Sequence, residues 1–318
     1  MFNHLLVPLD GSALAECVLP HAVALSRALD ARVTLLRVCE RSGLAGRGNA
    51  VAPLAWRVLV TEAGAYLDRV AGQLRQVGLH AETVLLEGQA AETVIEFARG
   101  HQVDLIMLSS HGQSGLSGWN ISSVVQKIIM RACIPVMIAR AYRPVSVELT
   151  GLRYSTILVP LDGSQRAECV LPLATALARA SEAKVLLAHV ACRPDVPRHT
   201  PLAPEDLRLT ERLVERSRSV ATRYFEELRA RLPMEVEFHL LTSHSIPIAL
   251  HDLVERESVD LVVLSAHGSS GGMKWPYGSV AVAFIAYCTS PLLIVQDLSP
   301  EELERSWAEM MARETAGH

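Results

Sequence analysis

The chain has 318 residues, of which 50% are hydrophobic, 20% are charged and 5% are aromatic, and its formal net charge is −4. This length predicts two domains of roughly 150 residues each. The weak negative charge disfavours a role in binding nucleic acid or an anionic membrane, and apolar runs such as Leu261–Leu264 are far too short to span a bilayer. We therefore expect a cytoplasmic protein without nucleic-acid or membrane partners.

Short aliphatic runs alternate with segments of helical periodicity along the first half of the chain. The tripeptide Asp10-Gly11-Ser12 supplies a turn and a helix N-cap directly after the first run. Such alternating βα units predict a parallel sheet that is covered by helices on both faces. We expect strands near His4–Leu9, Arg32–Val38, His80–Leu86, Asp104–Ser109 and Val136–Ala139.

The second half of the chain repeats the first. Leu6–Ala28 and Leu158–Ala180 are identical at 18 of 23 positions, and Val103–Gly112 is similar in sequence to Val259–Gly268. Because the landmarks keep their order, the whole domain is duplicated. We expect domains at 1–147 and 152–297, followed by a helical extension at 298–318. Residues 41–53 and 193–204 are expected to be loops after the second strand of each copy.

In an open parallel sheet, the ligand crevice lies at the carboxyl ends of the strands where the strand order reverses. This rule selects the loops after strands one and four of each copy. In the first copy these loops contain Pro8, Leu9 and Asp10, and then Ser109, His111 and Gly112. In the second copy they contain Pro160, Leu161 and Asp162, and then Ser265, His267 and Gly268.

Small residues precede a predicted helix nine residues after each of these glycines. They are Ser122-Ser123 in the first copy and Gly278-Ser279, followed by Val280, in the second. Small residues let backbone N–H groups approach an anion, and a helix start favours negative charge, so the pattern predicts a phosphate site. We expect the second copy to bind better, although the bulk of Trp275-Pro276-Tyr277 could obstruct its site.

This pattern resembles that of the universal stress proteins, whose ATP-binding members carry Gly, two residues, Gly, nine residues, Gly and then Ser or Thr. The resemblance covers both copies and implies that Asp10 and Val38, and likewise Asp162 and Val190, meet an adenine base. It implies phosphate contacts at Gly112, Ser122, Ser123, Gly268, Gly278 and Ser279. Ser109, Ser122 and Ser265 replace glycines of the pattern, and a serine with positive φ would be strained.

The resemblance further implies two tandem doubly wound, Rossmann-like domains with five-stranded parallel sheets that form an internal pseudo-dimer. The pairing would run through the last strands, Val136–Ala139 and Leu292–Val295, and a homodimer of two chains is left open. The implied ligand is ATP, ADP or AMP, with or without Mg²⁺, bound in a regulatory stress-response role.

Two other functions stay open: a ligand-free structural stress protein, and a slow ATPase or adenylyl-transfer enzyme. The sequence has neither a His-x-Gly-His nor a Ser-Gly-Gly-x-Asp-Ser signature of the enzymes. We interpret His111 and His267 as structural or ligand-neighbouring residues, assign no catalytic residue, and expect no metal site. The six cysteines are interpreted as small buried hydrophobic residues.

Overall fold

The structure is a computed structural model that describes residues 2–41, 53–112, 121–141, 148–193, 204–269 and 276–297. The chain divides into two compact units, one of residues 1–153 with 285–296 and one of residues 154–284 with 297–318. The predicted extension at 298–318 and most of the two predicted loops lie outside the described residues. None of the helices described is long and apolar enough to cross a membrane.

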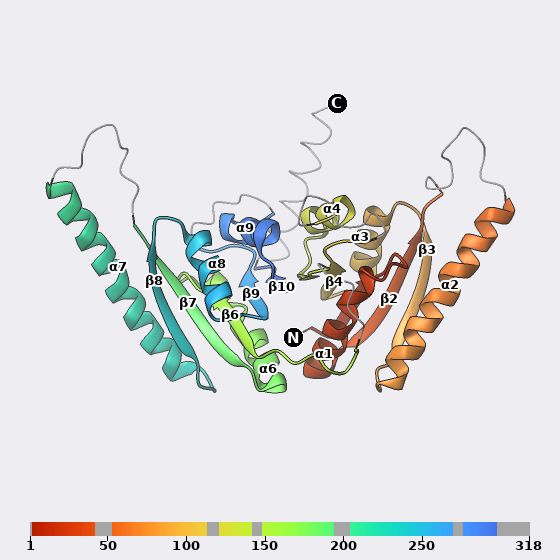
Figure 1. The fold of residues 1–318 in the computed structure, drawn as a ribbon, viewed down its shortest axis with the longest axis horizontal. Coiled ribbons are helices and arrows are strands. Elements are labelled where there is room, and N and C mark those ends of the chain that lie inside the picture. The colour runs from red at the N-terminus through yellow and green to blue at the C-terminus, as the bar shows by residue number, and fades with distance from the viewer. Residues whose placement is uncertain are drawn as a thin grey trace, which may run out of the picture. The chain divides into compact units, whose positions relative to one another are not determined.

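The first unit contains the five strands expected from the sequence, each within two residues of its predicted bounds. The sheet order is β3-β2-β1-β4-β5, and all neighbouring pairs in it are parallel (Figure 1). The elements are β1 (His4–Pro8), η1 (Ala15–Val18), α1 (Leu19–Leu29), β2 (Arg32–Cys39), α2 (Pro53–Gln76), β3 (Ala81–Glu87), α3 (Ala90–Gly100), β4 (Leu105–Ser109), α4 (Ser123–Ala132) and β5 (Val136–Ala139).

A sixth strand of the first unit comes from the end of the second copy. This strand, β10 (Leu292–Val295), pairs antiparallel with β5, and Leu293 lies opposite Met137. Both of these side chains are fully buried. The last strands of the two copies therefore form a ladder, which is the pairing expected from the resemblance.

The second unit repeats the same βα order. Its strands lie in the order β9-β6-β7-β8 and pair in parallel. The elements are β6 (Thr156–Pro160), α5 (Gln165–Glu168), α6 (Leu171–Ser181), β7 (Lys184–Cys192), α7 (Pro204–Arg231), β8 (Glu237–Ser243), α8 (Ile246–Arg256), β9 (Leu261–Ser265) and α9 (Ser279–Tyr287).

The strand order creates the crevice that the sequence predicts. In the first unit β1 lies between β2 and β4, and in the second β6 lies between β7 and β9, so the connections leave these strands in opposite directions. The central strands β1, β4, β6 and β9 are almost completely buried, as expected for strands covered on both faces. The loops that follow them therefore meet at one edge of each sheet.

The helix predicted after each Asp-Gly-Ser turn is broken into two pieces, which corrects the single helix expected there. The hydroxyl Oγ of Ser164 accepts a hydrogen bond from Ala167 N at 3.1 Å and caps α5. Ser12 makes the same bond to Ala15 N ahead of the short η1. The longer helices then start afresh near Pro20 and Pro172. Proline favours a first helical turn because it lacks an N–H group.

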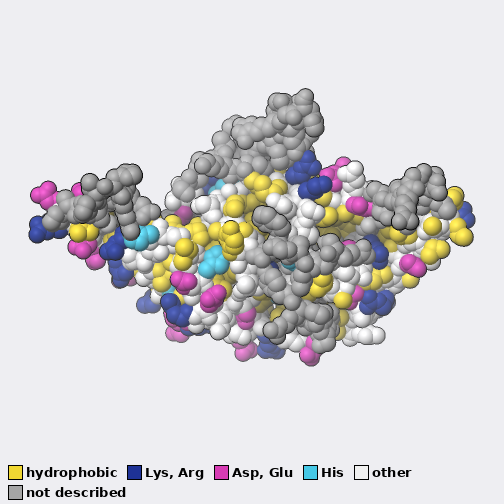
Figure 2. Space-filling model, turned by 45° about the horizontal axis from the view of Figure 1, so that its top comes forward, with side chains coloured by type: hydrophobic (Ala, Val, Ile, Leu, Met, Phe, Trp, Pro, Cys, Tyr) yellow, Lys and Arg dark blue, Asp and Glu magenta, His cyan; other side chains and the backbone are white. Residues whose placement is uncertain are grey.

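The outer surface of α7 is charged, as its spacing of Arg and Glu predicts. Arg208, Glu211, Arg212 and Glu215 are all exposed, and Figure 2 shows dark blue and magenta side chains along this part of the molecule. The expected burial of all cysteines is wrong for Cys169 and Cys192, which are exposed.

Candidate functional site

The second unit contains a cavity of about 210 Å³ at the carboxyl ends of β6, β7 and β9. Every residue predicted for the second copy lines it: Pro160, Leu161, Asp162, Val190, Ser265, His267, Gly268, Gly278, Ser279 and Val280. Ile246 and Leu250 of α8 add an apolar wall that the sequence reasoning missed. The sequence signal for these two residues was their spacing of four at the start of a helix, which places both on one face of it.

Asp162 joins the turn after β6 to the loop after β9. Its Oδ1 accepts hydrogen bonds from Ser164 N at 3.0 Å and Ser164 Oγ at 2.6 Å, and its Oδ2 accepts one from Ser269 N. Burial alone would raise the pKa of Asp162, but these bonds outweigh it and hold the pKa below its ordinary value. A Cβ atom on Gly268 would collide with the carboxylate, so glycine is required for this close approach.

The first turn of α9 offers unused backbone donors to the same cavity. Gly278 N donates to Ala266 O at 2.8 Å, and Gly278 has no side chain that could cap the helix. In the described part of the chain, no group accepts a hydrogen bond from the N–H of Ser279, Val280 or Ala281, all of which line the cavity. Such N–H groups and the helix dipole favour an anion.

His267 is fixed by an acidic residue that the sequence analysis did not identify. Asp297 Oδ1 lies 2.9 Å from both the backbone N and the ring Nδ1 of His267, and Arg166 Nη1 lies 3.5 Å from Asp297 Oδ2. The side chains of His267 and Asp297 are 3% and 1% exposed, so this hydrogen-bonded contact is buried, while Arg166 reaches Asp297 from a partly exposed position. The contact holds the loop that forms the floor of the cavity, which agrees with a structural role for His267.

The first copy builds a related site. Asp10 Oδ1 accepts hydrogen bonds from Ser12 N at 2.9 Å and Ser12 Oγ at 2.7 Å, and its Oδ2 lies where a Cβ on Gly112 would be. Leu9 N donates to Leu36 O, two residues before Val38, and Pro8 ends β1 beside them. The turn, Gly112 and the end of β2 therefore lie at one edge of the sheet.

The helix start differs between the copies. Ser122 caps α4, because its Oγ accepts a hydrogen bond from Val125 N at 3.3 Å, whereas Gly278, at the same place before α9, has no side chain that could do so. Ser123 then begins α4 as predicted. A phosphate at α4 would compete with the Ser122 side chain for backbone donors.

The three serines that replace glycines are not strained. Ser122 has φ −72, and neither Ser109 nor Ser265 is among the described residues with positive φ. Their hydroxyls instead stabilise the loops, since Ser109 Oγ donates to His111 O at 2.7 Å and Ser265 Oγ donates to His267 O at 2.6 Å. The strain considered from the sequence is therefore absent at these positions.

Tyr277, one of the bulky residues expected near Gly278, does not line the cavity. Tyr277 is 4% exposed and packs into the interior, while Trp275 lies outside the described residues. In the described ranges, no group of three or more His, Cys, Asp or Glu side chains is placed to hold a metal ion.

Comparisons with known proteins find a match for each of the two copies. The family model described as "Universal stress protein family" matches residues 1–140 and again residues 153–296. Universal stress protein MJ0531 of Methanocaldococcus jannaschii is 28% identical over 143 residues, covering 44% of this chain and 83% of that protein. Universal stress protein YxiE of Bacillus subtilis is 28% identical over 155 residues, covering 44% and 100%.

A solved structure resembles the whole chain. The crystal structure of a universal stress protein from Archaeoglobus fulgidus has a TM-score of 0.67 and 17% identity, and the match covers 94% of this chain and 100% of that one. At this identity the likeness concerns the fold.

Proposed function

Because the chain belongs to the universal stress protein family over both of its halves, we propose that it binds an adenine nucleotide and acts as a regulatory stress-response module. The nucleotide would be ATP, ADP or AMP, and its principal site would be the cavity of the second copy. One observation carries this proposal: ten residues chosen from sequence, from four separate segments of the second copy, line a single cavity. In that cavity the first turn of α9 presents its free N–H groups.

Each part of the cavity suits one part of a nucleotide. Val190, Ile246 and Leu250 provide an apolar surface for the base beside the Asp162 turn. Gly268 and the first turn of α9 provide backbone donors for the phosphates. Asp162 is the one carboxylate in the lining, and both of its oxygens already accept hydrogen bonds. A Mg²⁺ ion would therefore be held through phosphate oxygens and water rather than by protein ligands.

The test is isothermal titration of the full-length protein with ATP, ADP and AMP, using Gly278→Val as the site variant. A Cβ on Gly278 would lie at contact distance, 3.4 Å from Ala266 O and 3.7 Å from His267 Cα. A branched side chain would therefore stand within the cavity and keep phosphates from the helix start. We expect ATP affinity to fall by at least about tenfold, which corresponds to one lost charge-assisted contact.

Gly72→Val is the matched control, because a Cβ on Gly72 meets nothing within 4 Å and Gly72 lies on α2, away from the cavity. Its ATP affinity should equal that of the wild type. A wild-type protein that binds none of the three nucleotides, or equal loss in both variants, would refute the proposal.

A further inference from the structure

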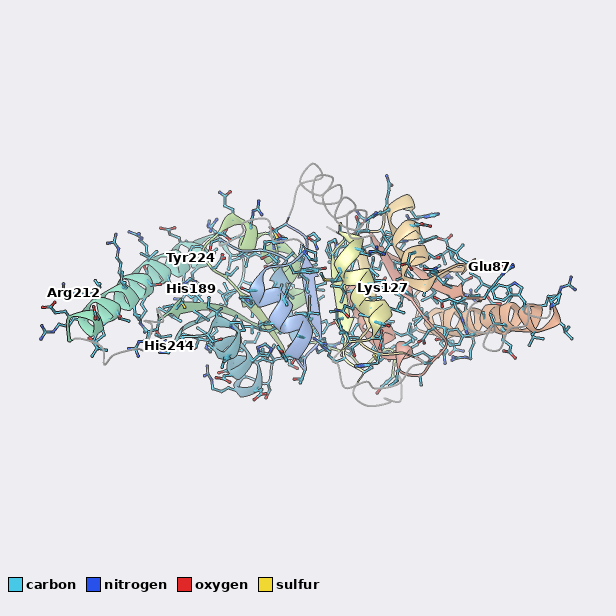
Figure 3. The ribbon with its side chains drawn as sticks, turned by 90° about the horizontal axis from the view of Figure 1, so that it is seen from above. Glu87, Lys127, His189, Arg212, Tyr224 and His244 are labelled. Atoms are coloured by element: carbon cyan, nitrogen blue, oxygen red, sulfur yellow. The ribbon has the colours of Figure 1, made fainter. Side chains whose placement is uncertain are left out.

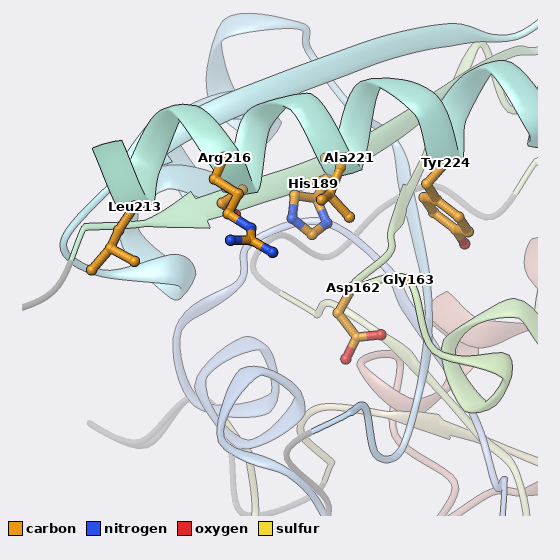
Figure 4. Close-up of a pocket in the computed structure, with 9 residues that line it drawn as sticks. Asp162, Gly163, His189, Leu213, Arg216, Ala221 and Tyr224 are labelled. Atoms are coloured by element: carbon orange, nitrogen blue, oxygen red, sulfur yellow. The ribbon is translucent and has the colours of Figure 1, made fainter. Parts of the chain in front are cut away.

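The second unit has another cavity next to the first, and Asp162 and His189 line both. It has a volume of about 390 Å³ and lies between α7 and the turn that contains Asp162 and Gly163 (Figure 4). Leu213, Val220 and Ala221 of α7 form its apolar wall. Leu213 and Val220 are each 50% exposed, so this wall presents apolar surface that a ligand could cover.

The equivalent space in the first copy is filled by an arginine. Arg37 follows Leu36, which pairs with Pro8, and its guanidinium lies 5.0 Å from the ring centre of Tyr66. A Cβ on Gly11 would come within 2.7 Å of Arg37 Nη1, so this guanidinium packs directly on the Asp-Gly-Ser turn. The first copy therefore closes the space between its turn and its long helix.

His189 occupies the place of Arg37 in the second copy, and its shorter side chain leaves the space open. It follows Ala188, which pairs with Pro160, and its ring Nδ1 lies 2.9 Å from Leu161 O. A Cβ on Gly163 would meet no atom within 4 Å, in contrast to Gly11. The replacement of Arg37 by His189 therefore removes the side chain that covers the turn in the first copy.

A positive charge stands at the rim of the open cavity. Arg216 extends from α7 toward His189 and Asp162 (Figure 4), and no described residue forms an ion pair with it. The first copy has Val58 at this position, eight residues before Tyr66 as Arg216 is eight residues before Tyr224. Asp162 does not neutralise this charge through an ion pair, since its oxygens accept hydrogen bonds from Ser164 and Ser269.

We propose that this cavity binds a small organic anion with an apolar, preferably aromatic, body and a single carboxylate or sulfonate group. The apolar body would lie against Leu213, Val220 and Ala221, and the anionic group would pair with Arg216. Tyr224 and His189 also line the cavity (Figure 4). Asp162 and His189 line both this cavity and the proposed nucleotide cavity, whereas Arg216 and the apolar wall of α7 line this cavity alone. The inference rests on that wall and on Arg216, and it does not depend on nucleotide binding.

The probe is 8-anilinonaphthalene-1-sulfonate, an aromatic monoanion whose fluorescence rises in apolar surroundings, titrated into the full-length protein with and without ATP. We expect saturable binding that Arg216→Ala weakens about tenfold, the value of one charge-assisted pair. His189→Arg, which restores the arrangement of the first copy, should weaken it at least as much. Arg216 is exposed, so its replacement leaves folding intact even if His189→Arg is unstable.

Arg212→Ala is the matched control, because Arg212 is an exposed arginine one turn earlier on α7 that does not line the cavity (Figure 3). Its affinity for the probe should stay within about twofold of the wild type. Equal losses in Arg212→Ala and Arg216→Ala, or no saturable binding to the wild type, would overturn the proposal. ATP affinity of Arg216→Ala should be unchanged, so this test and that of the nucleotide site fail separately.

Discussion

His111 and His267 occupy the same position in the two copies, yet different partners hold them. Ser110 Oγ lies 3.1 Å from His111 Nδ1 and accepts a hydrogen bond from Ala141 N at 3.0 Å. In the second copy the serine is replaced by Ala266, and Asp297, in place of Ala141, supplies the acceptor for His267. Because a buried polar ring nitrogen needs a partner, the loss of the serine in the second copy is compensated by the gain of the aspartate.

Asp297→Ala should therefore destabilise the protein strongly. It leaves the N–H and the ring Nδ1 of buried His267 without this acceptor and removes one partner of Arg166. We expect the free energy of unfolding to fall by about 2–4 kcal/mol, the range for hydrogen bonds to charged groups and broken buried pairs. Urea denaturation measures this change.

Asp252→Ala provides the control for Asp297→Ala, since Asp252 is an exposed aspartate on α8. It should shift the unfolding free energy by less than about 0.5 kcal/mol. If Asp297→Ala were as stable as this control, the contact between Asp297 and His267 would not hold the loop.

The motif residues of the second site could be read from the sequence, but Asp297 could not. Asp162, Gly268 and Gly278 follow recognisable strands at fixed spacing, so the sheet topology alone brings them together. Asp297 lies 30 residues after His267 and has alanine at the matching place in the first copy. Comparison of the two copies therefore gave no signal for this residue. Its role depends on how the chain end after β10 packs.

Helix α1 carries a buried histidine that the equivalent helix α6 lacks. His21 is buried, and α6 has Leu173 at the matching position. Burial lowers the pKa of His21 to about 4, from the ordinary value of 6.5, because the charged imidazolium is desolvated inside the protein. The folded state therefore keeps this ring neutral at pH values where the unfolded chain protonates it.

This difference makes stability fall on acidification. Below pH 6.5 the unfolded chain binds a proton at His21, whereas the folded protein keeps the ring neutral down to a pH of about 4. The free energy of unfolding therefore decreases as the pH falls from 6.5 to about 4. The full effect is about 3 kcal/mol. His21→Leu should remove this part of the loss between pH 7 and pH 4 in denaturation curves. An identical pH dependence in the variant and the wild type would contradict the burial of a neutral ring.

At the level of elements, the sequence predicted strands better than helix starts and cavities. The central strands are continuous aliphatic runs that are buried on both faces, so their positions follow from composition, whereas the edge strands β3 and β8 are partly exposed. The break after each Asp-Gly-Ser turn depends on Pro20 and Pro172 within an otherwise helical pattern. The cavity beside α7 depends on side-chain size, as in the replacement of Arg37 by His189, and hydrophobic periodicity carries no information on such differences.

The whole molecule combines two copies of one fold whose sites have diverged. In the first copy Arg37 covers the Asp-Gly-Ser turn and Ser122 caps α4. In the second copy His189 leaves the turn open, and Gly278 has no side chain that could cap α9. Since a duplicated domain starts with two equal sites, these differences predict that one chain has one strong nucleotide site.

Titration of the wild-type chain with ATP should accordingly give a stoichiometry near one ATP per chain. In the Gly278→Val variant most of the measured heat of ATP binding should be lost. Ser122→Gly should raise affinity at the first copy and bring the stoichiometry toward two, because a phosphate no longer competes with the Ser122 hydroxyl for Val125 N. Exchange of a serine cap for glycine costs only a few tenths of a kcal/mol, so the fold should tolerate it. Two equal sites in the wild type, or no gain in Ser122→Gly, would show that the helix cap does not distinguish the copies.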